Sequence, residues 1–281
     1  MSIAACSSTS SMSNVERGDN WIAACGPNDL WDKPGPPYKI YGNTYYVGTC
    51  GIAAILITGD DGHVLIDSGT AQGARIVAGN VRALGYDVDD IRILLHSHEH
   101  FDHVGGMAFL KGETGAQVIA SRRAAPVLET GIVAADDPQA SMHAPFAAVE
   151  VTATIAHLQT VNLGLLELTA LETPGHSPGA LSWQWIACEE TDCKTMVYLD
   201  SLSPISRDGY RFSDHPKQLA QYRAGLNALE GIACDFALTP HPIASSMHQR
   251  LGQPGGLEDK NGCRAYVNRI EGRLDQRLKS E

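Results

Sequence analysis

The sequence lacks any long apolar run. No stretch of its 281 residues approaches the roughly 18 to 20 apolar residues needed to cross a bilayer, so no membrane-spanning helix is predicted. Positive charge is also scarce, because 21 Lys and Arg residues stand against 32 Asp and Glu residues, a net charge of -11. Nucleic acid and anionic membrane surfaces are therefore unfavourable partners, since neither would gain from counterion release. A small-molecule partner fits this balance better.

Three further absences narrow the class of protein. No low-complexity linker divides the chain, so we predict one domain over residues 19–281, preceded by a flexible N-terminal segment over residues 1–18. No Ser-x-x-Lys motif occurs, which argues against an enzyme that uses the serine of this motif as its nucleophile. No Cys-x-x-Cys motif occurs either, which weakens the case for a thiolate metal site.

The N-terminal segment has two open explanations. Residues 3–6, IAAC, have the small-residue pattern of a lipoprotein cleavage site, but only two residues precede them. A complete leader needs a basic start and an apolar stretch of about 7 to 15 residues. Either a leader has been trimmed here, which makes Cys6 a candidate lipid anchor, or the match is chance. The Ser-rich residues 7–14 are expected to form a flexible tether.

The seven cysteines bear on the compartment. Cys188 and Cys193 flank a polar turn between two strand-like runs, so a bridge across that hairpin is sterically reasonable. The alternatives are that all seven are reduced thiols or that some bind metal. We predict three disulfides and an oxidising compartment, either the periplasm or the cell exterior, with Cys6 left over. The predicted pairs are Cys25 with Cys50, Cys188 with Cys193, and Cys234 with Cys263.

Strand and helix signals alternate along the chain. Both halves place helices after strands, and an α-β-β-α stack of two mixed sheets with helices outside is one layered solution to this pattern. The pattern alone does not exclude other mixed α/β folds. Residues 131–162 have weak periodicity and are expected to form long loops with one strand. Expected hairpins turn at residues 42–43 and 60–62, expected helices cover 70–86, 104–112, 215–231 and 262–281, and further strands are expected at 91–97, 116–121, 163–176, 179–187, 194–200 and 234–241.

Residues 96–103, HSHEHFDH, hold four histidines and one aspartate after an apolar strand. His98 and His100 are two residues apart, so in an extended segment both side chains project to one side and could reach one cation at about 2.0 to 2.1 Å. Asp102 and His103 follow where a helix is expected to begin, and that turn would point them elsewhere. The spacing HxHxDH therefore predicts two neighbouring metal ions.

Two distant loops offer further ligands. His176 in PGHSPG and His241 in TPHP each follow an expected strand and are flanked by proline or glycine. A histidine held in this way loses little conformational freedom when it binds a metal. Each taken alone would be an ordinary loop histidine, but beside the cluster we expect both to be ligands. His96 could be a third alternating ligand, but we expect it behind the ligands or in the pocket wall. The other histidines are expected to be surface or internally satisfied residues: His63, His143, His157, His215 and His248.

Taken together, HxHxDH, GHSPG and TPHP resemble the motifs of the metallo-β-lactamase superfamily, with closest similarity to the third subclass of class B β-lactamases. The resemblance runs from about residue 51 to residue 246. It implies an αββα sandwich with two zinc ions at the sheet edges. The implied ligands are His98, His100 and His176 for the first zinc, and Asp102, His103 and His241 for the second.

The segment YLDSLSP bears on the subclass. Many hydrolases of the superfamily place a metal-bridging aspartate at this strand end, whereas the third subclass has a serine, here Ser201. A shift of one residue would put Asp200 at the bridging position and favour a general hydrolase. The resemblance also implies that Ser201 and Ser203 bind the substrate carboxylate and that Tyr210 donates to the oxyanion. Asp67 is expected to support the zinc loop from behind.

The implied function is that of a secreted zinc β-lactamase, monomeric, that hydrolyses penicillins, cephalosporins and carbapenems and so confers antibiotic resistance. Two zinc ions lower the pKa of a bound water to about 7, and the resulting hydroxide would attack the lactam while Asp102 orients it. One alternative is a lactonase or thioesterase of the same fold. Another is a zinc-dependent binding or structural protein, although structural zinc sites are normally closed by four protein ligands.

Overall fold

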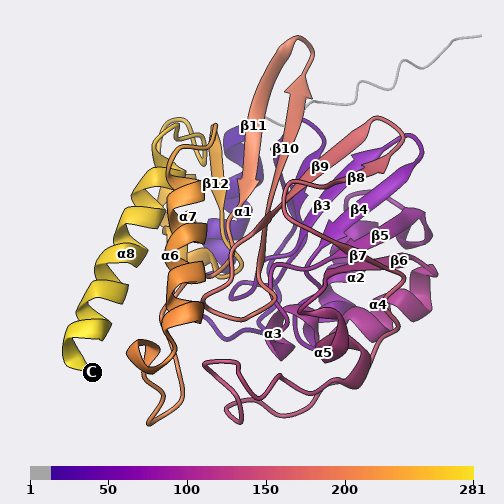
Figure 1. The fold of residues 1–281 in the computed structure, drawn as a ribbon. Helices are drawn as coiled ribbons and strands as arrows, with labels where there is room; N and C mark the ends of the chain where they lie inside the picture. The colour runs from indigo at the N-terminus through magenta and orange to yellow at the C-terminus, as the bar shows by residue number, and fades with distance from the viewer. Residues whose placement is uncertain (1–13) are drawn as a thin grey trace, which may run out of the picture.

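The computed structural model describes residues 14–281, and it consists of two β-sheets packed face to face with helices on both outer sides (Figure 1). The predicted αββα architecture is confirmed. The first sheet contains β1 Tyr38–Tyr41, β2 Thr44–Tyr46, β3 Ile55–Gly59, β4 Gly62–Ile66, β5 Ile91–Leu95, β6 Gln117–Ser121 and β7 Ala153–Ile155, in that order. The second has the order β12 Phe236–Leu238, β11 Asp192–Tyr198, β10 Leu181–Glu189, β9 Leu166–Glu172, β8 Thr160–Leu163.

Helices cover the outer faces of both sheets. On one side of Figure 1 lie α6 (Pro216–Glu230) and α8 (Gly262–Ser280), and on the other lie α2 (Gly73–Ala83), α4 (Met107–Thr114) and α5 (Ala125–Thr130). The remaining helices are α1 Asn14–Ala24, α3 Phe101–Val104 and α7 Met247–Leu251, with short 3-10 turns at Val88–Asp90, Phe212–Asp214 and Pro242–Ser245. None of the helices described is long and apolar enough to cross a bilayer.

Strand periodicity accounts for the layers. Along β4, Val64 and Ile66 point into the core between the sheets, whereas Leu65 between them packs with the residues of α2 and α4. Along β11, Tyr198 faces the same central core, and Val197 packs with α6 and α8. Successive side chains on a strand point to opposite faces, so strands that are apolar throughout can fill two layers at once.

The strand directions bring the predicted site residues to one place. β4 and β5 run parallel, so the segments that follow them leave the first sheet at the same edge. β11 is parallel to β12 and, through two antiparallel pairings, points the same way as β9. The segments after β9, β11 and β12 therefore leave the second sheet at one edge. Ligands can gather there, as in other sheets whose strands end at a common edge.

The N-terminal boundary differs from the expected one. Helix α1 runs from Asn14 to Ala24 and so crosses the predicted boundary between residues 18 and 19. Trp21 on this helix is 1% exposed, and its ring lies 5.9 Å from that of Tyr38 and 5.5 Å from that of Tyr46. The helix is therefore part of the domain. The rest of the expected tether, including Cys6, lies outside the described residues.

The three predicted cysteine pairs are joined in the structure: Cys25 with Cys50, Cys188 with Cys193, and Cys234 with Cys263. The second pair lies directly opposite in the β10–β11 register, as the hairpin pattern predicted. Residues 131–162 are mostly irregular and contain β7 and the start of β8, so one more strand begins there than expected.

Candidate metal centre

The motif HSHEHFDH begins where β5 ends. Its first half, residues 96–100, is irregular, and α3 begins at Phe101. The start of the helix separates His98 and His100 from Asp102 and His103, as the spacing predicted. All four side chains are buried, with no more than 4% exposed.

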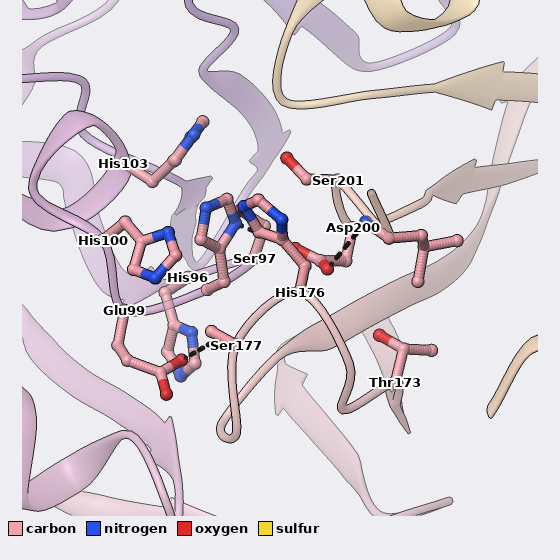
Figure 2. Close-up of polar contacts among 12 residues, drawn as sticks. His96, Ser97, Glu99, His100, His103, Thr173, His176, Ser177, Asp200 and Ser201 are labelled. Atoms are coloured by element: carbon pink, nitrogen blue, oxygen red, sulfur yellow. Dashed lines mark hydrogen bonds and ion pairs between the residues drawn. The ribbon is translucent and has the colours of Figure 1, made fainter. Parts of the chain in front are cut away.

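The first ligand group contains His98, His100 and His176. One ring nitrogen from each lies within 4.8 Å of the others, and the ring centroids of His100 and His176, both labelled in Figure 2, are 5.0 Å apart. His98 Nε2 is buried and has no hydrogen-bond partner among the described residues. A buried polar atom without a partner is costly, so this nitrogen fits the role of a metal ligand.

The opposite nitrogen of each of these rings faces a polar group outside the group. His98 Nδ1 lies 2.8 Å from Asp200 Oδ1, and His100 Nε2 lies 3.0 Å from Asp137 Oδ2. His176 Nδ1 lies 2.9 Å from the carbonyl oxygen of Ser203. Such partners orient a histidine and leave its other nitrogen free for a metal. The nitrogens on the other side of the rings are then Nε2 of His98, Nδ1 of His100 and Nε2 of His176, and the last of these lies 3.3 Å from Gln139 Nε2.

The second group of candidate ligands brings together Asp102, His103 and His241. Asp102 Oδ2 lies 3.1 Å from His103 Nε2 and 3.4 Å from His241 Nε2, and the two ring nitrogens are 3.3 Å apart. His103 Nδ1 lies 3.3 Å from Asp67 Oδ2. As predicted, Asp67 lies behind the ligands, where it also accepts hydrogen bonds from Ser97. Since His98, Asp102 and His103 also lie within 4.8 Å of one another, the two groups adjoin.

The charges in the site suit metal binding. Burial lowers the pKa of His98 and of His176 well below the usual range and lowers that of His100 to about 3, so these rings are neutral. Burial opposes ionisation of Asp102, but His103 and His241 outweigh it and hold the pKa of its carboxyl well below the usual range. Neutral imidazoles and an ionised carboxylate are the forms that bind metals. Burial disfavours the charged ring of His103, but Asp102 and Asp67 raise its pKa to about 10, so a metal there displaces a proton.

His96 lies outside both groups, as expected. Its Nε2 accepts a hydrogen bond from the Ser121 N–H (3.1 Å), and its carbonyl oxygen accepts one from Trp183 Nε1 (2.8 Å). Burial lowers the pKa of His96 to about 4, so the ring is neutral. His96 therefore fixes the start of the motif against β6 and β10.

Glu99 is a positioning residue that sequence reasoning missed. It is fully buried between two ligands in the chain but points away from them (Figure 2), and it accepts hydrogen bonds from Ser177 Oγ (2.6 Å) and from the Gly179 N–H (2.7 Å). These two residues follow His176. One carboxylate thus joins the loops that carry the two halves of the first ligand group. Burial, together with the charge of Asp137, raises the pKa of Glu99 to about 7.

The segment GHSPG also fits the G-x-S-x-G pattern of a serine nucleophile elbow. The structure excludes that role for Ser177. Its side chain is fully buried and its hydroxyl donates to Glu99, and the chain continues into the strand β10 rather than into a helix.

Two residues that follow β11 at its carboxyl end, Asp200 and Ser201, have different surroundings. Asp200 is fully buried with its carboxylate beside His98, whereas Ser201 lines the cavity at the ligand groups and its Oγ has no hydrogen-bond partner among the described residues. Burial raises the pKa of Asp200 well above its usual range. The aspartate therefore lies behind one ligand rather than between two metals.

A cavity of about 510 Å³ lies over the ligand groups. Ser203 lines it. His143, expected to be a surface or internally satisfied residue, lies in its wall and is within hydrogen-bond distance of Gln139 Oε1 (3.1 Å). Tyr210 is not brought to this cavity. It lines a neighbouring one of about 560 Å³, and its hydroxyl donates to Gln218.

An αββα sandwich that carries histidine and aspartate ligands at the carboxyl ends of its strands defines a metallohydrolase. Residues 47–185 match the family model of the metallo-beta-lactamase superfamily. The solved MIM-2 metallo-β-lactamase is 55% identical, over 94% of this chain and 98% of that one, with a TM-score of 0.91. MEM-A1, a subclass B3 metallo-β-lactamase isolated from a soil metagenome library, is 35% identical, over 89% and 98%, with a TM-score of 0.85. The chain belongs to the metallo-β-lactamase superfamily, and within it resembles the subclass B3 enzymes.

A curated relative matches less of the chain. The hydroxyacylglutathione hydrolase of Bradyrhizobium sp. (strain ORS 278) is 30% identical over 129 residues, which are 43% of this chain and 42% of that protein. The chain spans less than half the length of the curated relatives it matches. The predicted family and its third subclass are nevertheless confirmed by the solved structures.

Proposed function

We propose that the protein is a β-lactamase that uses two zinc ions and hydrolyses penicillins, cephalosporins and carbapenems. The proposed ligands are His98, His100 and His176 for one zinc, and Asp102, His103 and His241 for the other. The donor set supports zinc, because imidazole and carboxylate are both common zinc ligands and three protein ligands leave a position open for catalysis.

The observation that carries the proposal is the position of Ser201. Ser201 lines the cavity, while the carboxylate of Asp200 lies 2.8 Å from the outer nitrogen of His98. No carboxylate bridge comes from this strand end, and His103 stands beside Asp102 as a ligand instead. This arrangement favours a β-lactamase of subclass B3, the subclass of MEM-A1, over a hydrolase with a bridging aspartate.

The residues of the chain have separate tasks in the reaction. Bound zinc would supply a water nucleophile of lowered pKa and a Lewis acid toward the carbonyl oxygen. Asp102 can accept a proton from that water through whichever carboxylate oxygen does not bind metal. Ser201 and Ser203 can donate hydrogen bonds to the carboxylate that β-lactam antibiotics carry beside the lactam ring. Trp31 and Ile205 add apolar surface to the cavity and help to exclude bulk water.

A thioesterase is the second candidate, because a curated relative is a hydroxyacylglutathione hydrolase. The buried position of Asp200 disfavours it, since that carboxylate does not reach the cavity. A lactonase is disfavoured for the same reason.

The compartment and the assembly state are also proposals. Three joined cysteine pairs support an oxidising location, the periplasm or the cell exterior. A lipid anchor at Cys6 and a monomeric state complete this proposal.

The test is hydrolysis by the purified protein of a carbapenem and a cephalosporin, with and without a chelator. We expect turnover of both antibiotics and its loss after chelation, because the water nucleophile depends on the metals. Turnover of a homoserine lactone or a glutathione thioester without turnover of either antibiotic would contradict the proposal.

A further inference from the structure

One face of helix α8 forms a wall of the metal cavity. Four residues of this helix, spaced as neighbours on a helix surface, line the cavity together with Ser201 and Ser203. They are Tyr266, Arg269, Ile270 and Arg273. Tyr266 anchors the wall, because its hydroxyl donates to the carbonyl oxygen of Ser201 at 2.5 Å. Two guanidinium groups therefore lie on the wall that also holds the serines.

No carboxylate among residues 14–281 neutralises either guanidinium. Arg269 donates to the carbonyl oxygen of Ala244 and lies over the ring of Tyr266 at 5.2 Å, and both of these partners are neutral. No ion pair or hydrogen bond joins Arg273 to any residue in the described part of the chain. Asp102 is the one carboxylate among the residues that line the cavity, and its side chain contacts His103 and His241 rather than either arginine.

The ordinary explanation is a solvated helix face. That explanation fits Arg264, which lies on the same helix and lines none of the cavities described. It fits Arg269 and Arg273 less well. These two like charges lie one helical turn apart and repel one another, and such a pair is unexpected in a chain whose net charge is -11. Two uncompensated cations at the mouth of a substrate cavity in an acidic protein form a local field that attracts anions.

We propose that Arg269 and Arg273 select substrates that carry a second carboxylate. Ser201 and Ser203 are enough to bind the one carboxylate that every classical penicillin has, which leaves the guanidiniums free for another anionic group on the substrate side chain. A charge-assisted contact from arginine is stronger than one between neutral groups. This inference rests on the proposed β-lactamase function and narrows its substrate class.

Benzylpenicillin and its α-carboxy derivative provide a matched pair, because they differ by one side-chain carboxylate. In the wild type, raised salt should lower kcat/KM more for the derivative than for the parent. In Arg273→Gln, and more strongly in Arg269→Gln/Arg273→Gln, we expect kcat/KM for the derivative to fall about three- to tenfold more than for the parent, through KM. Arg264→Gln removes the same charge from the same helix outside the cavity and should leave the ratio unchanged.

Binding to chelator-treated protein separates this inference from the proposed function. Without metal the penicillins stay intact, so calorimetry on protein whose fold is verified by circular dichroism measures binding alone. We expect tighter binding of the α-carboxy derivative than of the parent, and loss of that difference in the double variant but not in Arg264→Gln. Equal binding of both penicillins by wild type and double variant would overturn the inference even if the enzyme hydrolyses them. A preserved, arginine-dependent difference without any hydrolysis by the metal-loaded enzyme would support the inference and contradict the proposed function.

Discussion

His176→Ala is expected to lower turnover of a cephalosporin at least about 100-fold, because it removes one of the three proposed ligands of the first zinc. The outer nitrogen of His176 faces the Ser203 carbonyl oxygen at 2.9 Å, and its other nitrogen completes the group with His98 and His100. Zinc content measured beside the kinetics should fall as well, because the first site would retain two of its three ligands.

The matched control is His157→Ala. His157 is exposed, accepts one hydrogen bond from the Glu172 N–H, and lines none of the cavities described. We expect its turnover to stay within about twofold of wild type, as for most surface substitutions. Equal losses in the two variants would contradict the assignment of His176 as a ligand. His143 is unsuitable as a control because it lies in the cavity wall.

Trp183→Ala is expected to lower the free energy of unfolding by about 3 to 5 kcal/mol, the usual cost of deleting a buried tryptophan. Trp183 is fully buried between the two sheets, and its indole N–H donates to the carbonyl oxygen of His96 at 2.8 Å. The substitution therefore leaves a cavity in the central core and an unpaired carbonyl at the start of the metal motif.

Urea unfolding followed by circular dichroism measures this loss. Trp183→Phe keeps most of the apolar volume but removes the indole donor, so it should cost less than the alanine variant. Ile186→Ala, on the same strand and 58% exposed, should change stability by no more than about 0.5 kcal/mol. A loss below about 1 kcal/mol in Trp183→Ala would mean that the core between the sheets is not the main source of stability.

The spacing of the metal motif could be predicted because it depends on local geometry. The start of a helix after His100 is enough to turn Asp102 and His103 away from the first pair. The histidines flanked by proline or glycine were recognisable because each follows a strand. The common strand edge that gathers them follows from strand directions, which the apolar runs alone do not contain.

The environment of individual side chains could not be predicted in the same way. Strand alternation made His96 a possible third ligand on the same side as His98. However, β5 ends at Leu95, so the alternation does not continue through His96 and His98. Glu99 stands between two ligands with no sequence signal, since its partners lie 78 and 80 residues away. Such contacts are made in the tertiary structure, and the spacing of residues in the sequence does not reveal them.

The predictions for Tyr210 and for the N-terminal segment also differ from the structure, because both depended on tertiary contacts. The role of Tyr210 was only implied by the resemblance, and the loop places this residue in the wall of the neighbouring cavity. Helix α1 begins directly after a Ser-rich stretch that favours a flexible interpretation, and its stability comes from packing of Trp21 against Tyr38 and Tyr46. Most helical stability in proteins comes from such packing, not from local propensity.

The most direct test of the central claim is stepwise return of zinc to chelator-stripped protein, with cephalosporin hydrolysis measured at each addition. We predict no hydrolysis by the stripped protein and recovery that is complete at two zinc ions per chain, in agreement with the ligand groups of His98, His100 and His176 and of Asp102, His103 and His241. Full hydrolysis by the stripped protein, or none after zinc is returned to a folded chain, would contradict the account.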